Sequence, residues 1–129
     1  MSRTFAGIFI ILHGLVHIWY VVLSFNLVTF QPDMGWTGSS WLFTSLKSNQ
    51  LIRIFAGVLF ILSTILFVIS GITILTNFSG ANTILSIAAI LSTITLLVFW
   101  DGKTDMIVQK GVIGVIINLV IIVTVFLNP

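Results

Sequence analysis

The chain has 129 residues, of which 58% are hydrophobic and only 6% are charged, and its mean hydropathy is +1.25. Soluble domains carry about 25% charged residues, so this composition excludes a soluble globular protein and indicates an integral membrane protein. The net charge of +2 without a basic cluster argues against nucleic-acid binding, and the lack of cysteine excludes disulfides, thiolate ligands and a cysteine nucleophile.

Four long apolar runs dominate the chain, and each is long enough to cross a hydrocarbon core of roughly 30 Å as a helix. We expect membrane spans at residues 4–29, 51–75, 81–100 and 106–127, with an interfacial loop at 31–50. Short turns before the third and fourth spans indicate antiparallel neighbours. The sequence therefore predicts one all-α domain over residues 1–129, a four-helix transmembrane bundle with antiparallel up-down topology.

The first span carries both histidines of the chain, His13 and His17, at a depth where ionisable groups are costly. At about 100° of rotation per residue, these two and Tyr20 fall on one narrow stripe of the helix. We expect the other three spans to cover this stripe, so that its polar atoms meet partners and not lipid tails.

The loop at 31–50 begins with a proline, an aspartate and a glycine that end the first helix. Ser39 and Ser40 are plausible N-caps of a short interfacial helix that reaches Lys47. Trp36 and Trp41 are expected to anchor the loop at the membrane interface, with a lid over a cavity as the alternative.

The second span carries adjacent small residues spaced by seven, at 56–57, 63–64 and 70–71, which predict a close helix-packing seam. Arg53, at the start of this span, is expected to reach headgroups or an acidic loop residue. The hydroxyls of the third span can bond back to their own helix, so no function is expected of them. Trp100 marks the interface, and Asp101 begins the turn that returns the chain into the membrane.

The fourth span buries an amide, Asn118, about half way across, on the same face as Gly111 and Gly114. In a bilayer this amide needs polar partners, and the histidine stripe is the richest source. On the side of the two longer loops the chain has four basic residues, against Arg3 alone on the side of the termini. The positive-inside rule therefore predicts a multi-pass protein of the cell membrane with both termini extracytoplasmic.

Four uses of the buried polar residues remain open. The histidines can be neutral and structural, bonded to Asn118 and to hydroxyls of the third or fourth span, so that they fix helix register. They and Tyr20 can donate to the carbonyl oxygens of a lipophilic molecule such as a quinone. His13 and His17 at i and i+4 can ligate a divalent metal, although a third ligand and a carboxylate are missing at that depth, or a haem shared with a second copy. The last use is a proton-linked or transport role.

Two resemblances accompany these patterns. The run LHGLVH at residues 12–17, together with residues 99–102, residues 110–114 and Asn118, resembles small four-span prokaryotic membrane proteins whose first helix carries an HGLxH motif. This resemblance implies the fold and no particular activity. Residues 51–60 are loosely similar to the DoxX group of four-helix proteins, some of which are linked to quinone-dependent oxidation. Here the segment opens the second span and not the first, so no function is transferred from it.

From these patterns we expect a small integral membrane protein without catalysis, because no buried carboxylate, nucleophile or phosphate-binding loop accompanies the histidines. It would be an accessory subunit or a binder of a lipophilic molecule, with His13, His17, Tyr20 and Asn118 as ligand-binding residues and no required cofactor. The alternative is a quinone-, haem- or metal-linked redox protein that uses the histidine pair. Besides the bilayer, the expected partners are a second copy of the chain or a larger membrane complex.

Overall fold

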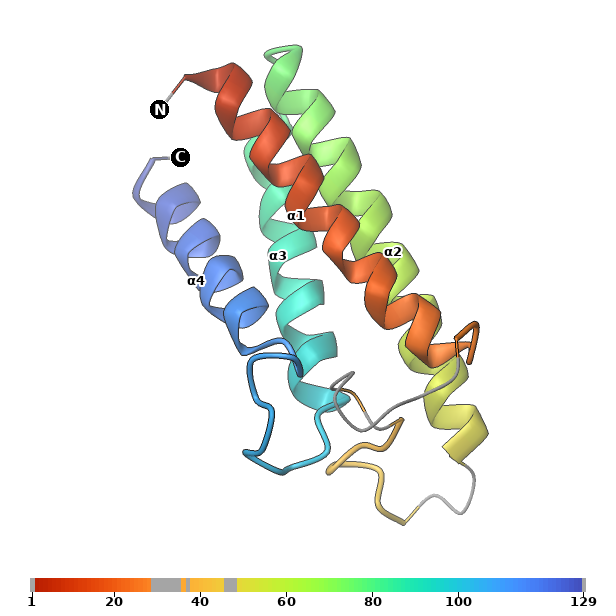
Figure 1. The fold of residues 1–129 in the computed structure, drawn as a ribbon. Helices are drawn as coiled ribbons and strands as arrows, with labels where there is room; N and C mark the ends of the chain where they lie inside the picture. The colour runs from red at the N-terminus through yellow and green to blue at the C-terminus, as the bar shows by residue number, and fades with distance from the viewer. Residues whose placement is uncertain (1, 29–35, 37, 46–48, 129) are drawn as a thin grey trace.

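The computed structural model describes residues 2–28, 36, 38–45 and 49–128 of the chain. In these residues the chain forms four helices, α1 (Arg3–Ser24), α2 (Asn49–Leu75), α3 (Ala81–Val98) and α4 (Val112–Leu127). The helices alternate in direction, so that both termini lie at one end of the bundle and the two longer loops lie at the other (Figure 1). The predicted all-α, up-down four-helix bundle is confirmed.

Three of these helices, α1, α2 and α3, are long and apolar enough to cross a membrane. Helix α4 is also apolar, but its 16 residues extend only about 24 Å at 1.5 Å per residue. Many large apolar side chains point outward, including Val16, which is 61% exposed, and Phe126, which is 83% exposed. Such an outer surface is unfavourable in water and suits contact with lipid.

Helices α1 and α2 cross closely because glycines meet at their interface. A Cβ atom added to Gly71 would lie 2.7 Å from the carbonyl oxygen of Gly7, and one added to Gly14 would lie 2.5 Å from the Cβ of Phe67. Such close approach of two backbones gains dispersion energy where no hydrophobic effect drives helices together. Five of the six small residues of the predicted seam on α2 are buried, and Thr64 is half-buried; the buried ones are Ala56, Gly57, Ser63, Ser70 and Gly71.

Trp36, Ser40 and Trp41, from the loop that precedes α2, cap the C-terminal end of α3. The last carbonyl groups of a helix have no partner within it, and here residues 97–100 all accept hydrogen bonds from this loop. The donors are the Trp36 indole to Phe99, the Ser40 hydroxyl to Val98, the Trp41 indole to Leu97 at 2.7 Å and the Trp41 backbone to Trp100 at 2.8 Å. The loop is thereby fixed against the end of the bundle.

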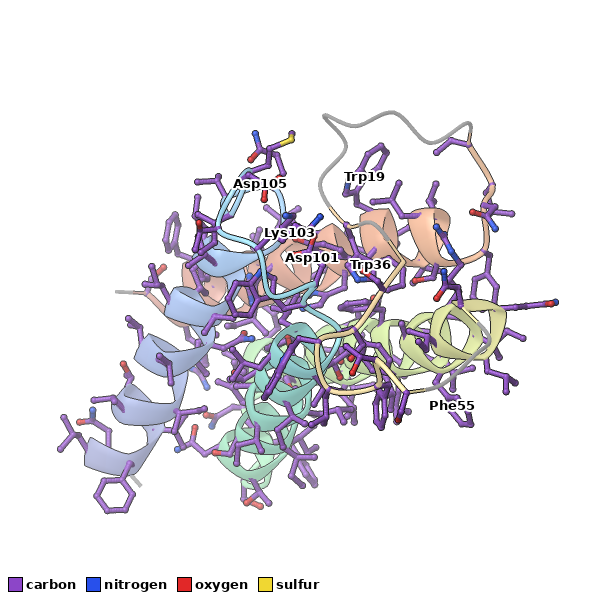
Figure 2. The ribbon with its side chains drawn as sticks, turned by 90° about the horizontal axis from the view of Figure 1, so that it is seen from below. Trp19, Trp36, Phe55, Asp101, Lys103 and Asp105 are labelled. Carbon is purple, nitrogen blue, oxygen red and sulfur yellow. The ribbon has the colours of Figure 1, made fainter. Side chains whose placement is uncertain are left out.

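This capping corrects two expectations for the loop. Residues 42–45 form turns, not the short helix expected from Ser39 or Ser40, and Lys47 lies outside the described residues. Trp36 is only 3% exposed and belongs to the packed end of the bundle, so it is no interfacial anchor. Viewed from the loop end, Trp36 lies among the helices, whereas Trp19 and Phe55 point away from the bundle (Figure 2). Trp41 is 51% exposed and combines capping with a position at the surface.

Helices α1, α3 and α4 are shorter than the predicted spans, and α1 and α4 differ most. Helix α4 begins at Val112, not at residue 106, because Met106 and Gly111 adopt left-handed backbone conformations with φ of 52° and 100°. A Cβ added to Gly111 would also lie 2.7 Å from Leu96. Helix α1 ends at Ser24, not at residue 29, because Asn26 is left-handed with φ of 52°. Residue 29 lies outside the described part of the chain.

Candidate functional site: a hydrogen-bonded histidine network

Four polar side chains from three helices meet inside the bundle. His13 and His17 of α1 are 7% and 2% exposed, and Ser92 of α3 and Asn118 of α4 are fully buried. The i and i+4 spacing places both imidazoles on the face of α1 that the other helices cover. The two histidines and Asn118 are thus brought together.

These side chains form a closed series of hydrogen bonds. The Nε2 atom of His13 lies 2.8 Å from Oδ1 of Asn118, and Nδ2 of Asn118 lies 2.8 Å from Oγ of Ser92. The same Oγ lies 2.6 Å from Nε2 of His17, whose Nδ1 lies 3.1 Å from the backbone oxygen of His13. The network therefore connects α1, α3 and α4 at one level of the bundle.

The backbone carbonyl of His13 fixes the direction of every bond in this network. A carbonyl only accepts, so Nδ1 of His17 carries the proton, and Nε2 of a neutral His17 accepts from the hydroxyl of Ser92. Ser92 then accepts from the amide nitrogen of Asn118, whose oxygen accepts from Nε2–H of His13. The two neutral imidazoles are therefore opposite tautomers, His13 with its proton on Nε2 and His17 with its proton on Nδ1.

Aromatic rings enclose the imidazoles on the side of α2. The ring of Phe67 lies 4.9 Å from that of His13 and 5.5 Å from that of His17, measured between centroids. The two imidazoles are perpendicular to each other, with centroids 5.4 Å apart. Phe67 is itself fully buried. Contact with apolar rings weakens screening, so the hydrogen bonds of the network gain strength from their surroundings.

Tyr20 was expected to share a ligand site with the histidines, but its hydroxyl bonds elsewhere. It donates to the backbone oxygen of Gln109 at 3.1 Å, in the segment that leads into α4. Its ring stacks on Phe60 with centroids 4.9 Å apart. Tyr20 therefore joins α1 to the start of α4 near the loop end, and it forms no hydrogen bond with His13, His17 or Asn118 in the described structure.

Ser92 is a central residue that the sequence reasoning did not single out, although it gave hydroxyls of the third or fourth span as possible partners of the histidines. The hydroxyls of Ser63, Ser70 and Thr95 do bond to the carbonyl four residues earlier, as expected for such residues in a helix. Ser92 instead bonds to His17 and Asn118. The signal that could have found it is its place on the small-residue face of the third span, opposite two polar groups that need a hydroxyl partner.

Metal ligation by His13 and His17 gains no support from this geometry. Within the described ranges no group of three His, Asp or Glu side chains could hold a metal ion. Both ring nitrogens of His17 and Nε2 of His13 already have hydrogen-bond partners. A metal or an axial haem bond at these atoms would have to break the network.

At the loop end, the side chain of Arg53 caps the C-terminal end of α1. Its guanidinium donates to the backbone oxygen of Leu23 and to Oδ1 of Asn26, both at 2.8 Å, and lies 5.7 Å from the ring centre of Trp36. A cation over an indole ring is attracted by its quadrupole. Arg53 therefore joins α2 to the end of α1 and to Trp36. The Trp100 indole bonds locally, to the Lys103 backbone oxygen at 2.9 Å.

A buried ion pair ties the 99–111 loop together. Nζ of Lys110 lies 2.9 Å from Oδ2 of Asp101, with both side chains 3% exposed, and 3.4 Å from Oδ1 of the exposed Asp105. Burial alone would raise the pKa of Asp101, but hydrogen bonds from Lys110 and the Lys103 backbone hold that pKa below its ordinary value. Burial alone would lower the pKa of Lys110, but bonds to both carboxylates hold it above its ordinary value. Both groups stay charged over the physiological pH range.

An apolar pocket of about 210 Å³ lies between α1 and α4, toward the termini from the network. Its lining includes Phe9 and Ile10 of α1 and Val120 and Ile121 of α4. The ring of Phe9 is parallel to that of His13 within 8°, with centroids 6.3 Å apart. The pocket therefore begins one helical turn from the imidazole of His13.

Comparisons of this chain with protein-family models, with curated proteins and with solved structures find no match. The geometry described above must therefore carry any functional conclusion by itself.

Proposed function

We propose that this chain is a non-catalytic membrane protein that binds a lipophilic small molecule in the pocket between α1 and α4, beside the histidine network. The observation that carries the proposal is an apolar pocket between helices, of the lining typical of lipophilic-ligand sites, in which the lining residue Phe9 stacks on the ring of His13. The pocket is lined by helices that face lipid, so a ligand can enter it from the bilayer.

The network supports a binding role over catalysis. Asp101 and Asp105 lie in the loop at the other end of α4, so neither can act as an acid or base with the histidines. The amide of Asn118 separates the imidazole of His13 from Ser92, and a neutral amide does not pass on protons as a hydroxyl or imidazole does. The network thus holds three helices in register.

Photolabelling in lipid nanodiscs tests this proposal. The probe is a ten-carbon alcohol with a diazirine in its chain, and crosslinked peptides are identified by mass spectrometry. Val120→Trp places an indole in the pocket, whereas Val123→Trp makes the same change on the lipid-facing side of α4; the two valines are 60% and 54% exposed. We expect saturable labelling of residues 6–10 and 120–125 that Val120→Trp abolishes and Val123→Trp leaves intact. Equal labelling of both variants, or labelling that does not saturate, would refute the proposed site.

The same protein can be checked for the redox alternative, which uses His13 and His17 as ligands of a haem or metal. Purified protein with a Soret band, or with stoichiometric metal lost in His13→Ala, would replace our proposal.

We also propose that the termini are extracytoplasmic. The support is the position of Arg53, Lys103 and Lys110 at the loop end, with Arg3 at the other end. Because the chain lacks cysteine, single cysteines at positions 2 and 103 report the side of each end by impermeant thiol labelling.

A further inference from the structure

We infer that the end of the bundle that holds both termini binds one phospholipid with an anionic headgroup. Its phosphate lies in a polar cavity beside Arg3, and one of its acyl chains lies in the groove between α3 and α4. This is a second site, separate from the proposed pocket between α1 and α4, and its failure would leave that pocket standing.

The polar cavity supplies donors and a positive charge. It has a volume of about 260 Å³ and lies where α1 begins and the α2–α3 turn crosses the end of the bundle (Figure 1). Its lining includes Arg3, Asn77 and Ser79, whose side chains have no hydrogen bond or ion pair within the described residues. The described acidic residues, Asp101 and Asp105, lie in the loop at the opposite end. A guanidinium can donate two parallel hydrogen bonds to phosphate oxygens, so the cavity suits a phosphate group in charge and in donors.

The groove between α3 and α4 continues from this cavity toward the middle of the bundle. It has a volume of about 670 Å³, and it shares Ser79 and Asn82 with the lining of the polar cavity, so the two adjoin. Ile90 of α3 and Ile122 of α4 line it further in. Asn82 and Ile90 are eight residues apart, which is about 12 Å along a helix. The lining thus changes from polar to apolar with depth, in the same order as the headgroup and the acyl chain of a phospholipid.

The level of the polar cavity is that of lipid headgroups. Helix α1 begins at Arg3 and α3 begins at Ala81, and the ends of membrane-spanning helices lie where the hydrocarbon meets the headgroups. Side chains of a helix lean toward its N-terminus, so the exposed side chain of Arg3 leans toward the membrane surface. One basic residue at this level favours an anionic lipid over a neutral one by about fivefold.

Native mass spectrometry of the full chain tests the headgroup preference. The protein is released from micelles that contain equal amounts of dioleoyl phosphatidylglycerol and dioleoyl phosphatidylcholine. We expect one bound phosphatidylglycerol, about fivefold more abundant than bound phosphatidylcholine. Arg3→Gln should remove this preference, whereas Lys103→Gln, which removes the same charge from an exposed residue at the opposite end, should preserve it. Equal binding of the two lipids, or an equal loss in the two variants, would overturn the inference.

The same assay separates a lipid phosphate from a free one. Inorganic phosphate in excess should leave the phosphatidylglycerol bound, because the acyl chain in the groove adds to its affinity. Displacement of the lipid by inorganic phosphate would show that the cavity takes the free ion and would overturn the inference.

Photolabelling tests the position of the acyl chain. The probe is a trace of phosphatidylglycerol with a diazirine in one acyl chain, in nanodiscs of phosphatidylcholine. We expect labelling of residues 83–90 and 122–126. Ile90→Trp places an indole in the groove and should abolish this labelling, whereas Ile87→Trp changes an exposed isoleucine outside the groove lining and should preserve it. Equal labelling of the two variants would overturn the placement of the acyl chain between α3 and α4.

Discussion

Replacement of Asn118 by leucine should destabilise the bundle. Leucine has a similar volume, so the change removes hydrogen bonds and leaves little cavity. Two bonds of 2.8 Å are lost, to His13 and to Ser92. Interhelical bonds in membrane proteins average about 0.6 kcal/mol each and reach about 1.7, which gives roughly 1–3 kcal/mol for two. The N–H of His13 is also left without a partner, and we therefore expect a loss of about 2–4 kcal/mol.

The measurement is reversible unfolding in mixed micelles as the fraction of denaturing detergent rises, followed by circular dichroism. Thr124→Val is the matched control, because the hydroxyl of Thr124 is exposed and bonds only to the carbonyl of Val120 at 2.7 Å. We expect the control to change the free energy of unfolding by no more than about 0.5 kcal/mol. If Asn118→Leu is as stable as this control, the network does not hold α4 in place, and the assignment of tautomers loses its basis.

Two other predictions concern the helix crossing and the loop. Gly71→Ala should lower the free energy of unfolding by about 1–3 kcal/mol, because the new Cβ would lie 2.4 Å from Cγ1 of Ile11. The control Gly114→Ala should lower it by less than about 1 kcal/mol, because its Cβ would lie 3.2 Å from a flexible leucine methyl. Similar stability of the two variants would contradict the close crossing of α1 and α2. Asp101→Asn should cost roughly 3 kcal/mol, because it leaves Lys110 buried with only the exposed carboxylate at 3.4 Å. Because the pKa of Asp101 lies below its ordinary 3.8 when folded and that of Lys110 lies above its ordinary 10.5, the pair should contribute fully between about pH 4 and pH 10.5. That contribution should fall as the pH drops through the folded pKa of Asp101 or rises through that of Lys110, and a pH titration of unfolding with Asp101→Asn as reference checks it.

Much of the fold could be predicted because the bilayer imposes simple rules on sequence. Apolar runs of spanning length specify helices, and the turn residues between them specify antiparallel neighbours. The helix ends were less predictable. The start of α4 moved from residue 106 to Val112, because a buried ion pair of Lys110 and the left-handed Gly111 occupy the expected first turns. Hydropathy cannot report such a pair, since its two partners are separated in the chain.

The candidate site was predictable only in part. Spacing alone placed His13 and His17 on one face, and the cost of an amide in lipid singled out Asn118. Ser92 was not singled out, because the hydroxyl of a helical serine can donate to a backbone carbonyl of its own helix. The amino-acid sequence does not show whether a given serine does so or bonds to another helix. Trp36 was misassigned for a related reason: an indole near the membrane surface has the same sequence signature whether it faces headgroups or caps a helix.

The sequence by itself determined that this chain folds as a bundle of apolar helices and that its few interior polar groups must find one another, since a bilayer offers them no water. Only the tertiary structure decided which atoms pair. The pairing depends on how far α3 and α4 are rotated about their axes and shifted along them relative to α1. A rotation by a fraction of a turn would change the pairing, and the hydropathy pattern does not specify rotation that finely. The same rotation, through one backbone carbonyl, determines which nitrogen of His13 carries the proton.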